Sequence, residues 1–233
     1  MTATLHHISE ESPQIYTFYF EPQSDIDYIA GQFIELTVPH ETPDDRGIKR
    51  WFTLSSSPTD DHLSITTRIT PDSSSFKRAL VSMTKGSEVH ISEPMGDFVL
   101  PQDVHTPLVF IAAGIGVTPY HSMFRWLHAV NQHRDIRFIY AVDNEDDIVF
   151  QDTFDEADIH ATVVVANPSD AWGGERGWLS ADHILKLSEA DDRSLIYLAG
   201  PEPFVETLAK DLKALKVPAS RIVVDFFQGY EKI

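Results

Sequence analysis

The sequence predicts a chain of two halves: an antiparallel β-rich half, followed by a doubly wound parallel α/β half. In the first hundred residues, short stretches of β-branched and aromatic residues alternate with turns containing Pro or Gly. After Pro101, continuous apolar strands alternate with segments whose apolar residues recur at helical spacing. The periodicity changes between Pro101 and Pro107, so we expect one unit over residues 1–102 and a second over 103–233.

The first half is expected to form either an antiparallel barrel or a sandwich. One helix is expected from about Ser74 to Val81, because serines precede its apolar positions and suit a helix N-cap. The predicted strands cover residues 15–20, 33–38, 51–54, 63–69 and 88–91.

The second half is expected to form a parallel sheet that is buried on both faces, because its strands are apolar without interruption. Helical spacing of apolar residues is seen in Met123, Leu127 and Val130 and in the segment from Phe204 to Leu215. The predicted strands cover residues 108–112, 138–142, 162–165, 195–198 and 222–224.

Composition excludes several classes of protein. The 233 residues contain no cysteine, which excludes a disulfide scaffold, a thiolate zinc site, a cysteine nucleophile and a cysteine-ligated iron–sulfur cluster. The formal net charge of −18 argues against nucleic acid or an anionic membrane as partner. The longest apolar run, Leu108–Val117, is too short to span a bilayer, and the N-terminus lacks the features of a signal peptide. We therefore expect a cytoplasmic protein without membrane insertion.

Positive charge is concentrated in one window. Residues 1–45 contain no Lys or Arg, and all seven basic residues of the first hundred lie between Arg46 and Lys85. Such a window in an acidic chain indicates either a bound anion or a chance cluster of solvated charges, and composition gives the two equal weight.

A glycine turn follows the first apolar strand of the second half, at Gly114-Ile115-Gly116-Val117-Thr118-Pro119. Glycines here let the backbone approach a diphosphate, and the start of the following helix offers unpaired N–H groups. The alternative is a turn required only for packing, since Pro119 replaces the third glycine of the usual dinucleotide motif.

The segment Arg50-Trp51-Phe52-Thr53 lies on a predicted strand inside the basic window. Alternation places Arg50 and Phe52 on one face, and Trp51 and Thr53 on the other. An arginine can hold a phosphate, an aromatic ring can pack on another ring, and a hydroxyl can bond a ring heteroatom. The alternative is an ordinary strand with one arginine reaching solvent.

The order of the motifs resembles that of the ferredoxin–NAD(P) reductase-like flavoprotein superfamily. The order is R-W-F-T-L-S-S, then G-D-F-x-L from Gly96, then A-G-I-G-V-T-P, then Y-L-A-G-P ending at Pro201, and finally an aromatic stretch from Asp225 to Tyr230. The resemblance covers nearly the whole chain. It implies a flavin-binding antiparallel β-barrel, then a nicotinamide-nucleotide-binding α/β unit, with the flavin ring at their interface.

The resemblance also implies roles for particular residues. Arg50 would meet the flavin phosphate, Phe52 would pack on the isoalloxazine, and Thr53 would bond near the reactive N5. Thr53 and Asp225 are the catalytic candidates, although Asp225 either relays a proton or only caps a strand end. The full set of cofactor candidates is Arg50, Trp51, Phe52, Thr53, Arg68, Ser74, Ser75, Phe227 and Tyr230 for flavin, with Lys77 assisting, and Gly114, Gly116, Thr118, Asp143, Gly200 and Pro201 for NAD(P).

Two positions depart from the family pattern. The family usually has tyrosine where Phe52 stands, so a hydroxyl contact is lost here. Many members have cysteine where Ala199 stands, so any thiol contribution is absent.

The cofactor preferences follow from local composition. FAD is favoured over FMN, because the serine-led helix after Pro71 is available for a second phosphate. NADH is favoured over NADPH, because the segments 143–147 and 166–170 offer acids rather than cations for a 2′-phosphate, although Arg176 could reach in.

The resemblance implies an enzyme that takes a hydride from NAD(P)H onto bound FAD and passes electrons to a separate acceptor. That acceptor would be a small redox protein such as ferredoxin or flavodoxin, free flavin, a quinone or an oxygenase component. The alternative is a non-catalytic nucleotide-binding regulatory or electron-transfer subunit that retains the fold. No metal site is expected, since the eleven histidines show no ligand spacing.

Overall fold

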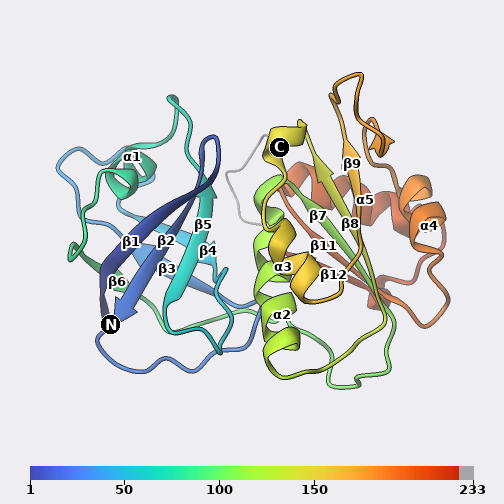
Figure 1. Cartoon of the computed structure of the whole chain (residues 1–233), viewed down its shortest axis with the longest axis horizontal. Helices are drawn as coiled ribbons and strands as arrows, with labels where there is room; N and C mark the ends of the chain where they lie inside the picture. Colours follow the sequence, from blue (N-terminus) through green and yellow to red (C-terminus); the bar gives the residue numbers. More distant parts are fainter. Residues whose placement is uncertain (226–233) are drawn as a thin grey trace.

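Two β-sheets lie side by side in the computed structural model, which describes residues 1–225 (Figure 1). The N-terminal sheet stands at the left of Figure 1, and the C-terminal sheet with most of the helices stands at the right. The chain passes from the first to the second between β6 (Glu88–Ile91) and β7 (Leu108–Ala113). The predicted division between residues 102 and 103 falls in this connection and stays a prediction.

The N-terminal sheet is a six-stranded antiparallel barrel with strand order β4-β3-β6-β1-β2-β5. The bridge between Leu54 and Ile65, and the 2.9 Å hydrogen bond from the Ser55 N–H to the Ser64 carbonyl, join the two ends of this order. The other strands are β1 (Thr2–Ser12), β2 (Ile15–Pro22), β3 (Phe33–Thr37), β4 (Lys49–Thr53) and β5 (Leu63–Arg68).

The helix α1 (Ser75–Val81) closes one end of the barrel. The Ser74 hydroxyl accepts a hydrogen bond from the Lys77 N–H and so caps the helix, as the sequence predicts. Phe76 and Leu80 are fully buried and join the barrel core.

Strand β1 was not predicted from the sequence. Its core positions Ala3 and Leu5 alternate correctly, but the pairing register with β2 shifts between Leu5 and His7. This β-bulge adds one residue to β1 and interrupts the period of two that identifies a strand. The result is a polar segment whose apolar positions follow no single pattern.

The C-terminal sheet has the strand order β10-β9-β8-β7-β11-β12, and all its pairings are parallel. Each predicted apolar segment is a strand. These are β7, β8 (Ile136–Val142), β9 (Ala161–Val165), β11 (Leu195–Ala199) and β12 (Ile222–Asp225), with the short β10 (Glu175–Arg176) at the edge. The doubly wound α/β prediction is confirmed.

Helices cover both faces of this sheet. The helices α4 (Ala181–Ser188) and α5 (Glu202–Ala214) bury Ile184 and Leu208 against the strand side chains of one face. The helices α2 (Thr118–Ala129) and α3 (Gln151–Glu156) cover the other face, and α2 also lies toward the barrel (Figure 1). Three short 3₁₀ segments complete the elements: Gly114–Val117, Glu145–Asp147 and Ala219–Arg221.

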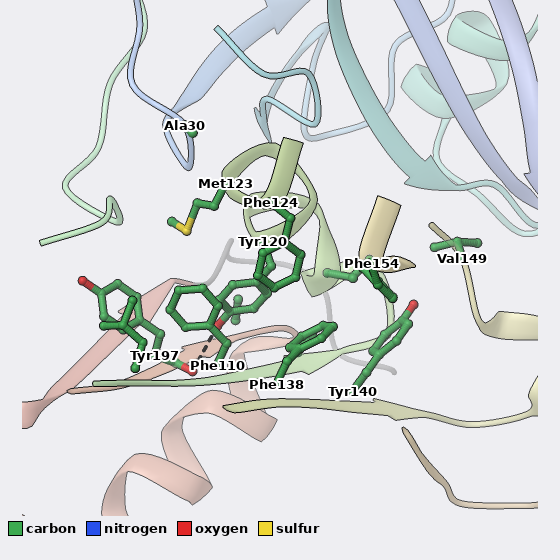
Figure 2. Close-up of a cluster of buried hydrophobic side chains, with 14 of the residues drawn as sticks. Ala30, Phe110, Tyr120, Met123, Phe124, Phe138, Tyr140, Val149, Phe154 and Tyr197 are labelled. Atoms are coloured by element: carbon green, nitrogen blue, oxygen red, sulfur yellow. Dashed lines mark hydrogen bonds between the residues drawn. The ribbon is translucent and has the colours of Figure 1, made fainter. Parts of the chain in front are cut away.

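Aromatic side chains fill the core between α2 and the sheet (Figure 2). Phe110 packs on Tyr120 with ring centroids 4.7 Å apart, and Phe124 packs edge-on against Phe138 at 5.2 Å. The buried Tyr120 hydroxyl donates to the carbonyls of Ile111 and Tyr197, both at 3.0 Å, so its polar atom is satisfied. This core holds α2 rigidly over β7 and β11.

Polar contacts attach α2 to the barrel. The buried Ser122 hydroxyl donates to the Ser56 carbonyl at 2.5 Å. The Arg125 guanidinium makes a two-point pair with the Asp60 carboxylate at 2.9 and 2.8 Å. Both barrel partners lie in the segment between β4 and β5. The two contacts therefore fix the position of α2 relative to this segment.

Across residues 1–225, no helix combines the length and the apolar composition needed to cross a bilayer.

Gly31 marks a second close contact between the halves, and we expect Gly31→Ala to destabilise the fold. A Cβ at Gly31 would lie 2.1 Å from the Phe98 carbonyl oxygen and 2.6 Å from the Met123 Cε, and the Gly31 φ is +100°. Gly47→Ala is the matched control, since its φ is +70° but nothing lies within 4 Å of the added Cβ.

Both substitutions impose backbone strain of about 1–2 kcal/mol, and only Gly31→Ala adds a clash with backbone. Chemical denaturation should therefore give a free energy of unfolding at least about 2 kcal/mol lower for Gly31→Ala than for Gly47→Ala. Equal losses in the two variants would contradict the close contact.

Candidate functional site

Four cationic side chains converge beside α1 and β4. Burial, followed by the charges of Arg46, Arg68 and Arg50, lowers the pKa of Lys77 to about 8. The Lys77 ammonium donates to the Arg68 carbonyl at 2.8 Å. Like charges held this close repel one another unless an anion lies among them. Four of the seven basic residues in the window are therefore brought together in space, as an anion site requires.

The Asp44 carboxylate lies within this cluster. One carboxylate oxygen accepts from the Arg50 guanidinium and from the Arg46 N–H, both at 3.0 Å, and the other accepts from the Ser75 N–H at 3.1 Å. These hydrogen bonds, together with the nearby Arg50 charge, hold the pKa of Asp44 below its usual value. Asp44 is thus an internal anion that uses the donors a phosphate group would use.

Arg50 is held in a defined orientation. Only 9% of its side chain is exposed, and the guanidinium lies 5.2 Å from the centre of the Phe76 ring. It also donates to the carbonyls of Gly47 and Lys49, at 3.1 and 2.7 Å. Phe52 lies on the same side of β4 and packs on Phe76 with centroids 5.8 Å apart. The predicted pairing of Arg50 and Phe52 on one face is therefore observed, and Phe52 contributes to the barrel core.

Thr53 and Asp225 meet where the barrel faces the α/β sheet. Thr53 ends β4 and Asp225 ends β12. Burial raises the pKa of Asp225 to about 6, and the polar Thr53 side chain opposes this shift. The carboxyl group can therefore hold or release a proton near neutral pH.

The glycine turn lies at the same edge of the sheet. Ala112 of β7 pairs with Ala199 of β11, and Ala199 pairs with Asp225 of β12. The carboxyl ends of these strands therefore lie together where the strand order reverses, which is where open α/β sheets bind ligands. The predicted nucleotide-binding glycines Gly114, Gly116 and Gly200 flank this point.

Gly116 also has a packing role. A Cβ at Gly116 would lie 2.4 Å from the Ala199 carbonyl oxygen and 2.6 Å from the Gly200 Cα. The Thr118 hydroxyl donates to the Ile115 carbonyl at 3.2 Å and so stabilises the turn. The packing alternative considered for this motif is thus observed, and it keeps the backbone of the turn close to the crevice.

The loops after β8 and β9 bind each other. The Glu145 carboxylate accepts from the Ser169 N–H at 2.8 Å, and the Arg176 guanidinium donates to the carbonyls of Ser169 and Asp170 at 3.2 and 3.4 Å. Burial raises the pKa of Asp143, and the charge of Asp147 adds to this shift. Arg176 is thus engaged by its own loop, and these loops also carry the acidic residues Asp143 and Glu145.

Comparison with known proteins shows similarity along most of the chain. Residues 110–210 match the family model described as the oxidoreductase NAD-binding domain. A flavohemoprotein of Oceanobacillus iheyensis is 27% identical over 239 residues, which cover 96% of this chain and 58% of that protein. The NADH oxidoreductase HCR of Escherichia coli is 27% identical over 214 residues, which cover 91% of this chain and 64% of that protein.

A solved structure has the same fold along its whole length. It is the flavohem-like FAD/NAD binding domain of nitric oxide dioxygenase from Vibrio cholerae, with a TM-score of 0.80 and 22% identity. The match covers 97% of this chain and 98% of that one. The chain has the fold of this FAD/NAD binding domain, and its residues 110–210 match the NAD-binding domain of oxidoreductases. It spans about three fifths of the length of the curated relatives it matches.

The predicted site residues fall into distinct groups. Arg50, Arg68 and Ser75 lie in or beside the cation cluster, and Ser74 caps α1. Trp51 is half exposed on the opposite side of β4, next to Phe33. Pro201 is the N-cap residue of α5. Phe227 and Tyr230 lie outside the described residues. All these assignments to cofactors stay predictions.

Sequence reasoning missed two features of the site: the contact of Arg68 with the α/β half, and the position of Asp44 in the cation cluster. The Arg68 guanidinium pairs with the Asp147 carboxylate of the α/β half at 2.8 Å, so it also links the two halves. Asp44 carries no signal in the sequence, because an aspartate in a turn rich in Pro and Asp is ordinary. Only its position opposite Arg50 distinguishes it.

We expect Asp225→Asn to stabilise the protein above pH 6. The pKa of Asp225 is raised in the fold, so the folded state binds a proton more tightly than the unfolded state. Stability due to this group is full below the unfolded pKa near 4 and is lost as the pH rises through about 6.

Asparagine avoids the buried charge, so the variant should gain up to about 3 kcal/mol over the parent at pH 7.5. Thermal unfolding of both proteins between pH 4.5 and 8 should show the gain shrinking toward low pH. A pH-independent difference would contradict the raised pKa.

Proposed function

We propose that the chain is an FAD-dependent NAD(P)H oxidoreductase that takes a hydride from the nicotinamide nucleotide and passes electrons to a separate acceptor. The observation that supports this most strongly is the cation cluster, in which the Asp44 carboxylate already uses the donors of a phosphate site. Arg50 of this cluster and Thr53, which neighbours Asp225 of the α/β half, both lie on β4.

The flavin phosphates would take the place of the Asp44 carboxylate. Arg50 offers a fixed guanidinium, Ser75 offers a backbone N–H, and Lys77 adds a buried ammonium. A diphosphate brings more negative charge to four cationic groups than one carboxylate does, so it would relieve more of their repulsion. The start of α1, with the Ser75 N–H, is available beside these cations for a second phosphate group, and this favours FAD over FMN.

The residues at the seam would position the reacting groups. A flavin bound there supplies the redox chemistry, because it accepts a hydride and releases electrons in one-electron or two-electron steps. The Thr53 hydroxyl is a hydrogen-bond donor held by β4, and the Asp225 carboxyl can hold or release a proton near pH 6. Ala199 contributes no polar group, so the chain itself provides dipoles and orientation rather than a nucleophile.

NADH is proposed as the preferred donor. A 2′-phosphate needs a cation, and Arg176 already donates to the carbonyls of its own loop. Glu145 and Asp143 add negative charge beside it. The Escherichia coli relative is likewise named an NADH oxidoreductase.

The acceptor is proposed to be a separate redox protein or an oxygenase component. No cysteine is available in the 233 residues to hold an iron–sulfur cluster, so electrons leaving a flavin must pass to another group. The competing proposal is a non-catalytic nucleotide-binding subunit, which the loss of the tyrosine hydroxyl at Phe52 and of the thiol at Ala199 favours.

One experiment separates these proposals and tests the donor. The protein should be loaded with FAD, and its visible spectrum and its oxidation of NADH and NADPH with a dye acceptor should be measured. We expect a flavin spectrum that bleaches with NADH under anaerobic conditions, and a kcat/KM at least about tenfold higher for NADH than for NADPH. Flavin uptake without turnover would favour the non-catalytic subunit, and no uptake of FAD or FMN would contradict both proposals.

We expect opposite effects on FAD affinity from Arg50→Gln and Asp44→Asn. Removing the guanidinium takes away a charge-assisted phosphate contact of about 1.5–3 kcal/mol, so the Kd should rise at least about tenfold. Removing the Asp44 charge takes away the internal competitor, so the Kd should fall.

Lys49→Gln is the matched control for these variants. It removes one adjacent positive charge, but the Lys49 ammonium is exposed and pairs with Glu35 at 2.7 Å. Fluorescence titration should show a change of less than about threefold for this variant. If Arg50→Gln and Lys49→Gln weakened FAD binding equally, FAD affinity would depend only on the total positive charge of this region and not on the position of Arg50.

A further inference from the structure

Three potential metal ligands meet on the outer face of the barrel, on strands β1 and β2 and at the residue directly before β5. The Glu21 carboxylate lies 3.5 Å from the Nε2 of His62 and 3.8 Å from the Nε2 of His6. The rings of His6 and His62 face each other with centroids 4.2 Å apart. One ligand atom from each residue lies within 4.8 Å of those of the other two.

The strand register explains why these side chains meet. Leu5, Phe20 and Leu63 pair across the three strands, and all three are buried in the barrel core. Each candidate ligand is the next residue along its strand, or the one before, and therefore points to the opposite, outer face. His6, Glu21 and His62 thus form a row across three adjacent strands.

The bulge in β1 adds a fourth histidine beside this row. In a regular strand the side chain after His6 would point into the core. The register shift between Leu5 and His7 lets the His7 side chain lie on the outer face as well. The His7 ring stacks on Tyr19 with centroids 4.1 Å apart, and its Nδ1 lies 2.7 Å from the Nδ1 of His6. A hydrogen bond between these two atoms leaves the Nε2 of His6 with a lone pair toward Glu21.

His7 also fixes the orientation of the His6 ring. The contact between the two Nδ1 atoms can hold the proton of His6 Nδ1, which is the usual arrangement around a metal-binding imidazole.

We propose that His6, Glu21 and His62 bind a divalent transition-metal ion with the ligand preference of Zn²⁺. Two imidazoles and one carboxylate are a donor set that Zn²⁺ accepts, with bonds of about 2.0–2.1 Å. Two ligands of a tetrahedral ion at those bond lengths lie roughly 3.4 Å apart, close to the two nitrogen–oxygen distances at this site. This proposal runs against the sequence-based expectation of no metal site, which rested on spacing along the chain.

The ion would tie together parts of the barrel that meet the α/β half. His62 lies two residues after Asp60, which pairs with Arg125 of α2. Fixing His62 to β1 and β2 would therefore also fix the segment that attaches α2. The site is separate from the cation cluster, so its occupancy is expected to change stability more than nucleotide binding.

The test uses the full chain without a polyhistidine tag, stripped with a chelator and titrated with Zn²⁺ by calorimetry. We expect one ion per chain and a rise in the thermal unfolding midpoint with Zn²⁺ concentration. Co²⁺ should give the visible absorption bands of an imidazole-bound ion, which reports on the ligands without any variant.

The variants His62→Ala and Glu21→Gln should each raise the Kd for Zn²⁺ at least tenfold, while circular dichroism shows the fold retained. His105→Ala is the matched control, since His105 is exposed and lies outside this group, and its Kd should not change. Equal binding by His62→Ala, Glu21→Gln and His105→Ala would overturn the proposal, as would the absence of both stoichiometric Zn²⁺ binding and a Co²⁺ spectrum. Because flavin binding is measured separately, failure of this site and failure of the proposed function are distinguishable.

Discussion

The attachment of α2 to the barrel is the constraint on which the rest of the structure depends. The Arg125–Asp60 pair is partly exposed, so it contributes about 1 kcal/mol or less, and the buried Ser122 hydrogen bond contributes about as much. These contacts are too weak to hold two halves alone. The close approach of Gly31 to Phe98 and Met123 supplies the packing that makes the arrangement rigid. The same arrangement brings Thr53 of the barrel next to Asp225 of the α/β half.

The same arrangement concentrates unfavourable groups at the seam. A buried carboxyl with a raised pKa and a lysine with a lowered pKa are both costly to the fold. They lie on opposite sides of β4, one facing the α/β half and one among the cations beside α1. Such perturbed groups gather where a ligand can compensate them, since the ligand then gains the free energy that the fold lost.

Glycines in this chain serve packing and access together. Gly116 lets the turn after β7 contact the backbone of Ala199 and Gly200, and this contact keeps the turn at the strand ends. A side chain there would separate the two strand ends and fill the crevice. The sequence motif therefore has one physical basis, close backbone contact, that serves both the packing and the ligand-binding interpretations.

Local sequence patterns were sufficient for most of the fold. The apolar strands β7, β8, β9, β11 and β12, the helix α1 and the boundary region between the halves follow from periodicity, Pro and Gly, and capping serines. Strand β1 could not be predicted, because its bulge at His6 breaks the alternation, and a bulge is set by pairing with β2 rather than by β1 alone.

The chemistry of the individual side chains was determined by the sequence alone: where positive charge is concentrated, which residues can hold an anion, and the absence of any thiol. Only the tertiary structure decided which of these groups face each other. Asp44 opposite Arg50, Thr53 beside Asp225, and His6 beside Glu21 and His62 are separated by between 6 and 172 positions along the chain. Contacts at such separations depend on strand register and on the packing of the two halves, which no local pattern encodes.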